Sequence, residues 1–362
     1  MRHSRGVRVD ELETPCLVVD RDVLDRNVAA MADRARRAGL DLRPHAKTHK
    51  CLEIGRLQHR AGAVGLTVAT VGEAEVFAEA GADDLFVAYP LWAAGRKGAR
   101  LRAVAERSRL RVGMDGVEAA ALLARALAGT QAEVLVELDS GHHRTGVAPA
   151  DAGWVAAEAA RLGLRVAGVF TFPGHGYGPG AAGPAAADEA AALRAGGAAL
   201  VAAGVEGRVR SGGSTPTAAL ADEGTLTELR PGVYVFGDAQ QVELGTTAWA
   251  DVALTAAATV VSRSGRSVVL DAGSKVLGAD RPDWTTGRAR LADLPAARVT
   301  ALSEHHATAT LPEGDALPEL GSVLRVVPNH VCHAVDLADE LVVARSGEVV
   351  DRWRVAARGR NA

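Results

Sequence analysis

Lysine is scarce in this chain, which is unusual because basic residues as a whole are not. Of the 41 basic residues among 362, four are lysine, and the others are arginine. A reaction that needs a lysine amine therefore has few candidates. The four lysines are Lys47, Lys50, Lys97 and Lys275.

The chain also lacks features that mark several other classes of protein. No apolar run approaches the ~20 residues that span a bilayer, and the charged N-terminal residues are unlike a signal-peptide core. With 41 basic against 44 acidic side chains, the basic excess of a nucleic-acid-binding domain is missing. The three cysteines are too few for a disulfide framework. We therefore expect a cytoplasmic protein that binds neither nucleic acid nor membrane.

Short apolar runs alternate with alanine-rich amphipathic stretches from about residue 40 to residue 240. Eight short strands with helices between them favour a closed parallel α/β barrel, with an open doubly wound sheet as the alternative. The predicted strands are residues 40–44, 65–70, 84–89, 110–114, 133–138, 166–172, 207–210 and 233–236.

After residue 237 the runs become β-branched, alternating and closely spaced, which is typical of an antiparallel sheet. We therefore predict a TIM-like (β/α)8 barrel over residues 20–240, followed by a mainly antiparallel β-domain over residues 241–362. Residues 1–19 are expected to join that second domain. The Gly/Ala/Pro-rich residues 178–184 predict a loop. The β-domain strands are predicted at 252–261, 267–270, 297–302, 322–327 and 340–345.

Polar clusters follow the predicted barrel strands, where the chemistry of a parallel barrel belongs. Lys47 and Lys50 come after the first strand, and a lysine amine there can form a Schiff base with an aldehyde. The spacing does not decide between the two lysines, and a solvated basic turn is the alternative. The glycine-rich residues 211–217 can cradle a phosphate, with hydroxyl donors from Ser214 and Thr215. Tyr234 can add a phenolic donor. The combination suggests pyridoxal phosphate.

His330 and Cys332 lie near the end of the second domain, two residues apart. On a strand or extended loop their side chains point the same way. Imidazole nitrogen and thiolate sulfur are good ligands for zinc, and two protein ligands suit an open catalytic site. The alternative is a buried cysteine beside a hydrogen-bonded histidine.

These segments, taken in order, resemble the D-threonine aldolase and D-serine dehydratase group of enzymes. That group belongs to the alanine racemase-like fold type of pyridoxal-phosphate enzymes, and the resemblance covers nearly the whole chain. The matching segments are Thr14-Pro15, Arg43-Pro44-His45-Ala46-Lys47-Thr48-His49-Lys50, His143-Arg144-Thr145-Gly146-Val147, Gly174-His175-Gly176-Tyr177, Ser211-Gly212-Gly213-Ser214-Thr215-Pro216-Thr217, Glu228-Leu229-Arg230-Pro231-Gly232-Val233-Tyr234, Asp271-Ala272-Gly273-Ser274-Lys275 and Pro328-Asn329-His330-Val331-Cys332.

The resemblance implies a role for each of these site residues. Lys47 carries the cofactor covalently, and Arg144 holds its phenolic oxygen. His330 and Cys332 become the ligands of a divalent metal, namely zinc, manganese or magnesium. Active sites of this fold type usually form between two subunits, so a head-to-tail homodimer is expected. The other residues assigned to the cofactor are Tyr177, Gly212, Gly213, Ser214, Thr215 and Tyr234.

The chain departs from the family pattern at one place. Relatives often read Ser-Glu-Glu-His where this chain has Ser303-Glu304-His305-His306. An imidazole at His305 therefore replaces a carboxylate, which leaves substrate identity and metal preference open.

The resemblance implies a lyase that acts on small D-3-hydroxy amino acids. In dehydration, Lys47 removes the Cα proton and a metal-bound hydroxyl leaves, giving a keto acid and ammonia. In retro-aldol cleavage, a base such as His175 removes the hydroxyl proton, giving glycine and an aldehyde. A His-x-Cys pair is more typical of the dehydratases, so Cys332 favours dehydration slightly. An amino-acid racemase and a non-catalytic pyridoxal-phosphate-binding protein are further alternatives; the racemase needs no metal, and the second domain argues against the binding protein.

Overall fold

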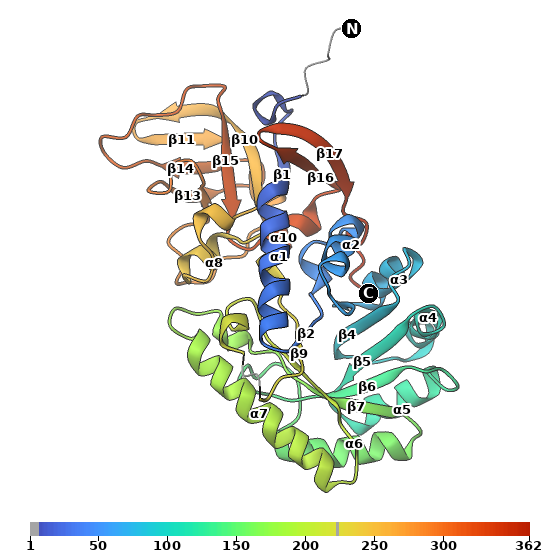
Figure 1. Ribbon diagram of the computed structural model, residues 1–362. Helices are drawn as coiled ribbons and strands as arrows, with labels where there is room; N and C mark the ends of the chain where they lie inside the picture. Colours follow the sequence, from blue (N-terminus) through green and yellow to red (C-terminus); the bar gives the residue numbers. More distant parts are fainter. Residues whose placement is uncertain (1–6, 222–223) are drawn as a thin grey trace. The chain divides into compact units, whose positions relative to one another are not determined.

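A computed structural model describes residues 7–221 and 224–362 of the protein (Figure 1). The chain forms two compact units, here called the barrel unit and the β unit. The predicted domain boundaries, at residues 20 and 240, stay predictions. The barrel unit consists of Ala30–Lys47, Ile54–Gly232 and Gly359–Ala362, and the β unit of the chain up to Ala29, Thr48–Glu53 and Val233–Arg358.

The barrel unit is built on eight strands, and all the pairs between them are parallel. Their order is β2-β9-β8-β7-β6-β5-β4-β3, and a parallel bridge from His45 to Thr67 joins the two ends of this order. The predicted TIM-like architecture is therefore confirmed. The strands are β2 (Asp41–Leu42), β3 (Leu66–Val68), β4 (Asp84–Pro90), β5 (Arg109–Met114), β6 (Glu133–Glu137), β7 (Arg165–Phe170), β8 (Val209–Gly212) and β9 (Glu228–Leu229).

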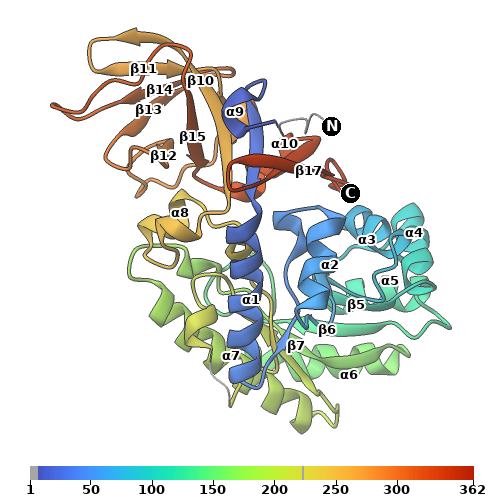
Figure 2. The ribbon, with the colours of Figure 1, turned by 45° about the horizontal axis from the view of Figure 1, so that its top comes forward.

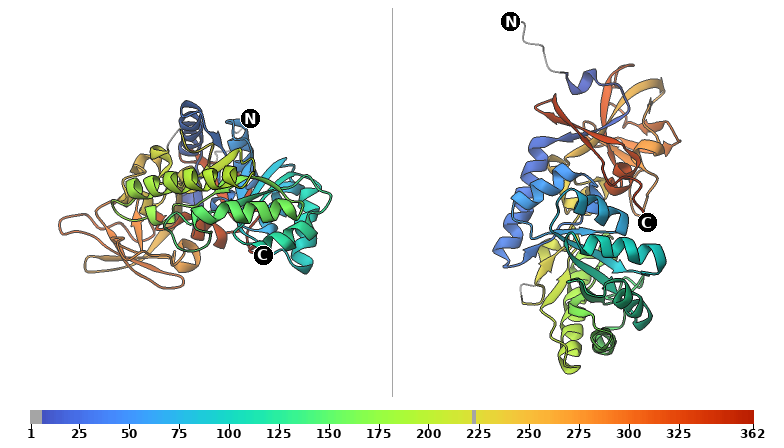
Figure 3. Two further views of the ribbon diagram at one scale, coloured as in Figure 1. Left: turned by 90° about the horizontal axis from the view of Figure 1, so that it is seen from below. Right: turned by 90° about the vertical axis from the view of Figure 1, so that its right-hand side faces the viewer.

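Helices flank the barrel strands, and neighbours from α3 to α7 contact one another in sequence (Figure 2). Thr70 caps α3 by accepting the Glu73 N–H, while the Glu73 carboxylate accepts the Ala69 N–H at 2.6 Å. In the view from below, α6 and α7 run side by side in green and yellow-green (Figure 3). The helices up to residue 202 are α1 (Arg21–Arg37), α2 (Leu52–Arg60), α3 (Val71–Glu79), α4 (Gly95–Ala105), α5 (Val117–Ala126), α6 (Ala152–Arg161) and α7 (Ala182–Ala202), with short 3-10 helices η1 (Val9–Glu11), η2 (Ala46–Thr48), η3 (Pro149–Asp151) and η4 (Gly174–Gly176).

Two local predictions in this part of the chain are wrong. The eighth barrel strand is β9, Glu228–Leu229, whereas the predicted residues 233–236 contain the buried 3-10 helix η6, Val233–Val235. A short apolar run does not distinguish a buried strand from a buried helical turn. The predicted loop at 178–184 is also too long, because α7 begins at Ala182. Pro184 fits in its first turn, where a missing N–H breaks no helical hydrogen bond.

The β unit contains a nine-stranded sheet that is antiparallel except for the pair β1–β16. The N-terminal strand β1 joins this sheet between β10 and β16, and the predicted mainly antiparallel β-domain is confirmed. Strands β12, β14 and β17 were not predicted. The strands are β1 (Cys16–Asp20), β10 (Leu254–Ser264), β11 (Ser267–Leu270), β12 (Ala289–Leu291), β13 (Arg298–Leu302), β14 (Ala307–Thr310), β15 (Val323–Pro328), β16 (Glu340–Arg345) and β17 (Glu348–Arg354).

Helical segments connect these strands, and α9 contacts α10. None of the helices within the described ranges is long and apolar enough to cross a membrane. The segments are α8 (Ala239–Glu243), α9 (Ser274–Leu277) and α10 (Val331–Leu337), with 3-10 helices η5 (Ala218–Leu220) in the barrel unit and η7 (Trp249–Asp251) in the β unit.

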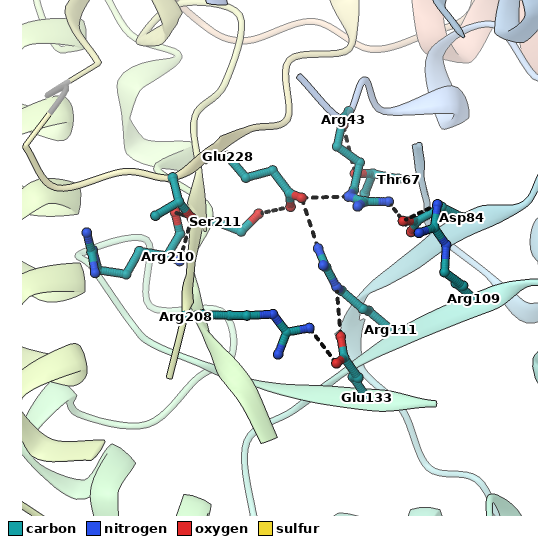
Figure 4. A network of polar contacts seen from close by, with 11 residues as sticks. Arg43, Thr67, Asp84, Arg109, Arg111, Glu133, Arg208, Arg210, Ser211 and Glu228 are labelled. Carbon is teal, nitrogen blue, oxygen red and sulfur yellow. Dashed lines mark hydrogen bonds and ion pairs between the residues drawn. The ribbon is translucent and has the colours of Figure 1, made fainter. Parts of the chain in front are cut away.

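A network of buried charges lies within the barrel unit (Figure 4). Arg43 bonds to Asp84 at 2.6 Å and to Glu228 at 2.7 Å. Glu228 also accepts from Arg111 at 3.0 Å and from Ser211 at 2.6 Å. Burial raises the pKa of the Glu228 carboxyl, but the neighbouring Arg43 and Arg111 outweigh it, so the pKa is lowered overall. Glu228 is therefore held as a fully bonded anion in the barrel interior.

Candidate functional site

Phe172, just beyond the end of β7, is the centre of a cluster in the barrel unit. The Lys47 ammonium lies 5.6 Å from the centroid of its ring, and the Arg144 guanidinium carbon lies 5.4 Å from it. The rings of His142 and Tyr177 have centroids 5.6 Å and 6.2 Å away. We call these five residues the Phe172 cluster. The structure thus brings three of the predicted site residues, Lys47, Arg144 and Tyr177, around one aromatic ring that the sequence analysis did not single out.

The structure separates the two lysines that sequence spacing left open. Lys47 belongs to η2, which follows strand β2, and its amine faces the Phe172 ring. Lys50 is buried in the β unit, where its ammonium lies 2.6 Å from the carboxylate of Asp336 on α10. Lys50 is thus held in an ion pair of the β unit, whereas the Lys47 amine lies against the aromatic ring of the Phe172 cluster.

Glu137, the last residue of β6, is a buried carboxyl that the sequence analysis missed. It lines a small cavity together with Arg144 and Phe172. Among the described residues its Oε2 atom has no hydrogen-bond partner. Burial raises the pKa of Glu137 to about 7, although a hydrogen bond from Thr145 and the charge of Arg144 oppose that shift. Its position at the carboxyl end of a predicted strand is the signal that could have identified it.

The glycine-rich turn after β8 has the backbone of a phosphate cradle. Gly213 has φ +82°, and a Cβ there would lie 2.6 Å from Leu229 Cδ2. Ser214 and Thr215 are buried, and the Ser214 N–H donates to Thr217 Oγ1 at 2.9 Å. One donor of the turn is already used, because the Gly213 N–H donates to a buried glutamate, Glu189 of α7, at 2.6 Å.

His175 lies in η4, beside the Phe172 cluster. Its Nε2 is 3.2 Å from the carboxylate of Asp188, and its Nδ1 is buried with no hydrogen-bond partner in the described part of the chain. A Cβ on Gly141 would lie 3.2 Å from the His175 ring. Burial, followed by the charges of Arg144 and His175, lowers the pKa of His142. The His142 imidazole is therefore neutral at neutral pH, and it lies in the same cluster as Lys47 and Arg144.

His330 and Cys332 come together in the β unit, although not on an extended segment. His330 is the N-cap of α10, with φ −128° and ψ 104°, and Cys332 lies in its first turn. Burial lowers the pKa of His330, but its contact with Cys332 and the charge of Asp238 outweigh burial and raise the pKa to about 9. The Cys332 sulfur lies 3.3 Å from Thr48 Oγ1.

Asp238 supports this pair from the N-cap of α8. The buried carboxylate accepts the Val331 N–H at 3.1 Å, and its Oδ2 lies 3.7 Å from His330 Nδ1. Burial raises the pKa of Asp238 to about 6. A carboxylate behind a histidine fixes the orientation of the ring in many metal sites. Within residues 7–221 and 224–362, no group of three or more His, Cys, Asp or Glu side chains is arranged to hold a metal ion.

Two further residues considered in the sequence analysis lie in the β unit. Tyr234 belongs to η6 and is buried, while the phosphate turn belongs to the barrel unit. His305 is exposed in the turn between β13 and β14. Beside it, Glu304 forms an ion pair with Lys275 at 2.8 Å, which accounts for the fourth lysine as a surface contact.

The residues of the barrel unit fit pyridoxal phosphate by their chemistry. Lys47 supplies an amine for an aldehyde, and Arg144 supplies a cation for an anionic oxygen. The glycine turn fits a phosphate group, because glycine leaves the backbone open to an anion and the buried hydroxyls of Ser214 and Thr215 add donors. In the β unit, the soft donor set of His330 and Cys332 fits a divalent ion such as zinc in a site with open positions.

Comparison with known proteins places the chain in a family. Residues 19–240 match the family described as "Alanine racemase, N-terminal domain". The chain belongs to this family. Residues 253–344 match a second family, described as "Putative serine dehydratase domain". The predicted resemblance to the D-threonine aldolase and D-serine dehydratase group is thereby confirmed.

Relatives within this group resemble the chain over most of its length. D-threo-3-hydroxyaspartate dehydratase of Delftia sp. is 35% identical over 89% of this chain and 91% of its own. D-threonine aldolase of Arthrobacter sp. is 33% identical over 98% of this chain and 95% of its own. The solved structure of the Delftia dehydratase superposes with a TM-score of 0.89, at 32% identity over 96% of this chain and 98% of that one.

Proposed function

We propose that the chain is a pyridoxal-phosphate- and divalent-metal-dependent lyase of D-3-hydroxy amino acids, with dehydration to a keto acid and ammonia as its main reaction. The observation that carries this proposal is the Phe172 cluster, which brings a lysine amine and an arginine together in an alanine racemase-like barrel. The two full-length relatives named above act on D-3-hydroxy amino acids, one as a dehydratase and one as an aldolase.

The barrel residues have distinct tasks in this proposal. Lys47 holds the cofactor and later moves the substrate's Cα proton on its Nζ atom. Arg144, on the same aromatic ring, binds the cofactor's phenolic oxygen and keeps it anionic. Gly212, Ser214 and Thr215 bind the phosphate. The cofactor, when bound, withdraws electrons from Cα and so makes that proton acidic.

His330 and Cys332 hold the metal in this proposal. A metal there acts as a Lewis acid on a hydroxyl oxygen, which makes the hydroxyl a better leaving group. Asp238 orients the His330 ring through the contact described above. A solved structure 32% identical to this chain is a cysteine-to-alanine mutant of D-threo-3-hydroxyaspartate dehydratase "in the metal-free form", which supports a metal in that relative.

Retro-aldol cleavage to glycine and an aldehyde is the second candidate, because an aldolase is almost as similar to the chain as the dehydratase. His175 is the candidate base for the β-hydroxyl proton, with Asp188 bonded to its Nε2. The two reactions differ in the bond that breaks, Cβ–O in dehydration and Cα–Cβ in cleavage. The Cys332 ligand favours dehydration.

The products decide between these reactions. Protein loaded with pyridoxal phosphate and zinc or manganese is incubated with D-serine, D-threonine and D-threo-3-hydroxyaspartate, and the products are identified by mass. A keto acid with stoichiometric ammonia is the expected result. Glycine and an aldehyde as products would show aldol cleavage instead of dehydration. No turnover of any D-3-hydroxy amino acid would refute the proposed lyase activity. Exhaustive chelation should abolish activity, and unchanged activity would refute the proposed dependence on a divalent metal.

A further inference from the structure

Glu189 is a buried carboxyl that belongs to helix α7 and yet bonds to the phosphate turn. Its side chain is 2% exposed, and its Oε1 accepts the Gly213 N–H at 2.6 Å. This contact joins two segments that are 24 residues apart in the sequence. The sequence gives no sign of it, because Glu189 stands in an alanine-rich amphipathic helix.

The turn and the glutamate fit each other closely. Gly212 has no room for a side chain, because a Cβ there would overlap the Glu189 carboxylate. Gly213 adopts φ +82°, a conformation that residues with a side chain rarely adopt. Its N–H donates the hydrogen bond to Glu189. Without that acceptor a buried N–H would be left without a hydrogen-bond partner. The turn would then be expected to rearrange.

A buried carboxyl here also affects the charge of the phosphate site. The groups that face Glu189 are the Gly213 N–H on the turn and the Arg230 guanidinium beyond β9. Burial raises the pKa of Glu189 to about 7, even though both of these groups oppose the shift. The carboxyl is therefore partly neutral at neutral pH, and its ionised form would repel a phosphate dianion at the same turn.

We propose that Glu189 is a positioning residue for the cofactor's phosphate, which it affects through the Gly213 N–H without touching the cofactor. The proposal rests on the proposed function, because it takes pyridoxal phosphate as the ligand of the turn. Two consequences follow. Removal of the Glu189 acceptor oxygen weakens only the part of cofactor binding that comes from the phosphate group. Ionisation of the Glu189 carboxyl weakens the same part.

Pyridoxal separates phosphate recognition from the rest of cofactor binding, because it has a hydroxyl in place of the phosphate. Dissociation constants of pyridoxal phosphate and pyridoxal are measured for the full-length apo-protein and for Glu189→Leu and Glu189→Gln. The matched control is Glu73→Leu, since Glu73 is a buried glutamate of the same unit that accepts a backbone N–H, that of Ala69, at 2.6 Å.

Glu189→Leu should bind pyridoxal phosphate at least about tenfold more weakly, the equivalent of one lost hydrogen bond, and pyridoxal as before. Glu189→Gln keeps an acceptor oxygen and should restore binding to within about threefold. Glu73→Leu should not change the ratio of the two constants. Equal weakening of both ligands by Glu189→Leu, or no weakening, would overturn the proposal.

A second measurement uses Glu189→Gln, which changes the side chain least. In the wild type, the preference for pyridoxal phosphate over pyridoxal should fall as pH rises from 6 to 8.5, by more than in Glu189→Gln. Identical pH profiles would overturn the charge effect. If the wild type shows no lyase activity and no cofactor binding, the proposed function fails and this inference fails with it. An active enzyme in which the Glu189 variants behave like the control refutes the inference alone.

Discussion

Two contacts carry the proposed assignment of the cofactor to Lys47. Lys47 lies against Phe172, whereas Lys50 is committed to Asp336. We expect borohydride reduction of the cofactor-loaded protein to leave the cofactor's mass on Lys47, as shown by fragmentation of the peptide. Lys47→Ala should lose the cofactor's visible absorbance and more than ~99% of activity, since a covalent nucleophile cannot be replaced.

The matched variant is Lys50→Ala, which removes the neighbouring lysine. It should keep the cofactor's absorbance, but it removes the ammonium of a buried ion pair with Asp336 and should lower the melting temperature by several degrees. Reduction products found on Lys50, or an unchanged spectrum in Lys47→Ala, would show that the assignment is wrong.

Glu137 should make the stability of the apo-protein depend on pH. Its pKa of about 7 lies above the value near 4.5 of the unfolded chain, so the folded state holds a proton that the unfolded state has released. Stability is therefore lost as pH rises from about 4.5 to 7 and changes little above that. Because Glu137→Gln cannot ionise, its free energy of unfolding relative to the wild type should increase by about 1–3 kcal/mol between pH 5 and pH 8.

Denaturant titrations at pH 5 and pH 8 measure this difference directly. Glu118→Gln, at an exposed position of α5, is the control and should leave the difference near zero at both pH values. A constant difference for Glu137→Gln would mean that the carboxyl is ionised in the folded protein throughout this range.

The sequence predicted some site residues and missed others, and the difference lies in the position of their side chains. Lys47 stands in a polar segment that follows a predicted strand, and the resemblance to a known family added Arg144 and Tyr177. Phe172 and Glu137 were absorbed into predicted strands, and Glu189 into a helix. Their importance comes from contacts with residues distant in the sequence, such as Glu189 with Gly213. Periodicity carries no information about such contacts.

At the scale of elements, the buried network around Glu228 fixes strands of the barrel to one another. Arg43, Arg111 and Ser211 all bond to this one carboxylate. Glu228→Gln removes the charge that the buried Arg43 and the half-buried Arg111 share. The loss of one partner from a buried ion pair typically costs about 3–5 kcal/mol, so we expect a decrease of that size in the free energy of unfolding.

Asp33→Asn tests the same chemistry at the surface, because Asp33 pairs with Arg36 at 2.7 Å with both side chains at least half exposed. This variant should change the free energy of unfolding by less than about 1 kcal/mol. Comparable losses in both variants, measured by urea titration, would contradict the structural role given to Glu228.

The elements that were predicted well are those with a clear apolar pattern. Strands β11 and β16 have the predicted limits. The two-residue strand β9 was missed because its neighbours, Arg230 and Pro231, break the apolar pattern, while the more apolar Val233–Val235 forms a 3-10 helix. His330 and Cys332 meet at the start of α10 rather than on a strand, with His330 as the extended N-cap residue and Cys332 in the first turn.

At the scale of the whole molecule, the change in sequence pattern near residue 237 predicted a barrel followed by a mainly antiparallel sheet. It also predicted that the N-terminal segment joins the sheet, and β1 lies there between β10 and β16. The pattern did not show that residues 48–53 group with the β unit. Such a short insertion carries no periodicity of its own, and only its contacts reveal where it belongs.

The most direct test of the central claim is a proton NMR time course in D2O. The protein is loaded with pyridoxal phosphate and metal and is given the separate D- and L-enantiomers of threonine and threo-3-hydroxyaspartate. We expect the D-enantiomers to be converted to keto acid and ammonia, with the L-enantiomers left intact. Conversion of D to L with deuterium at Cα and the β-hydroxyl retained would instead show a racemase, and would contradict the account.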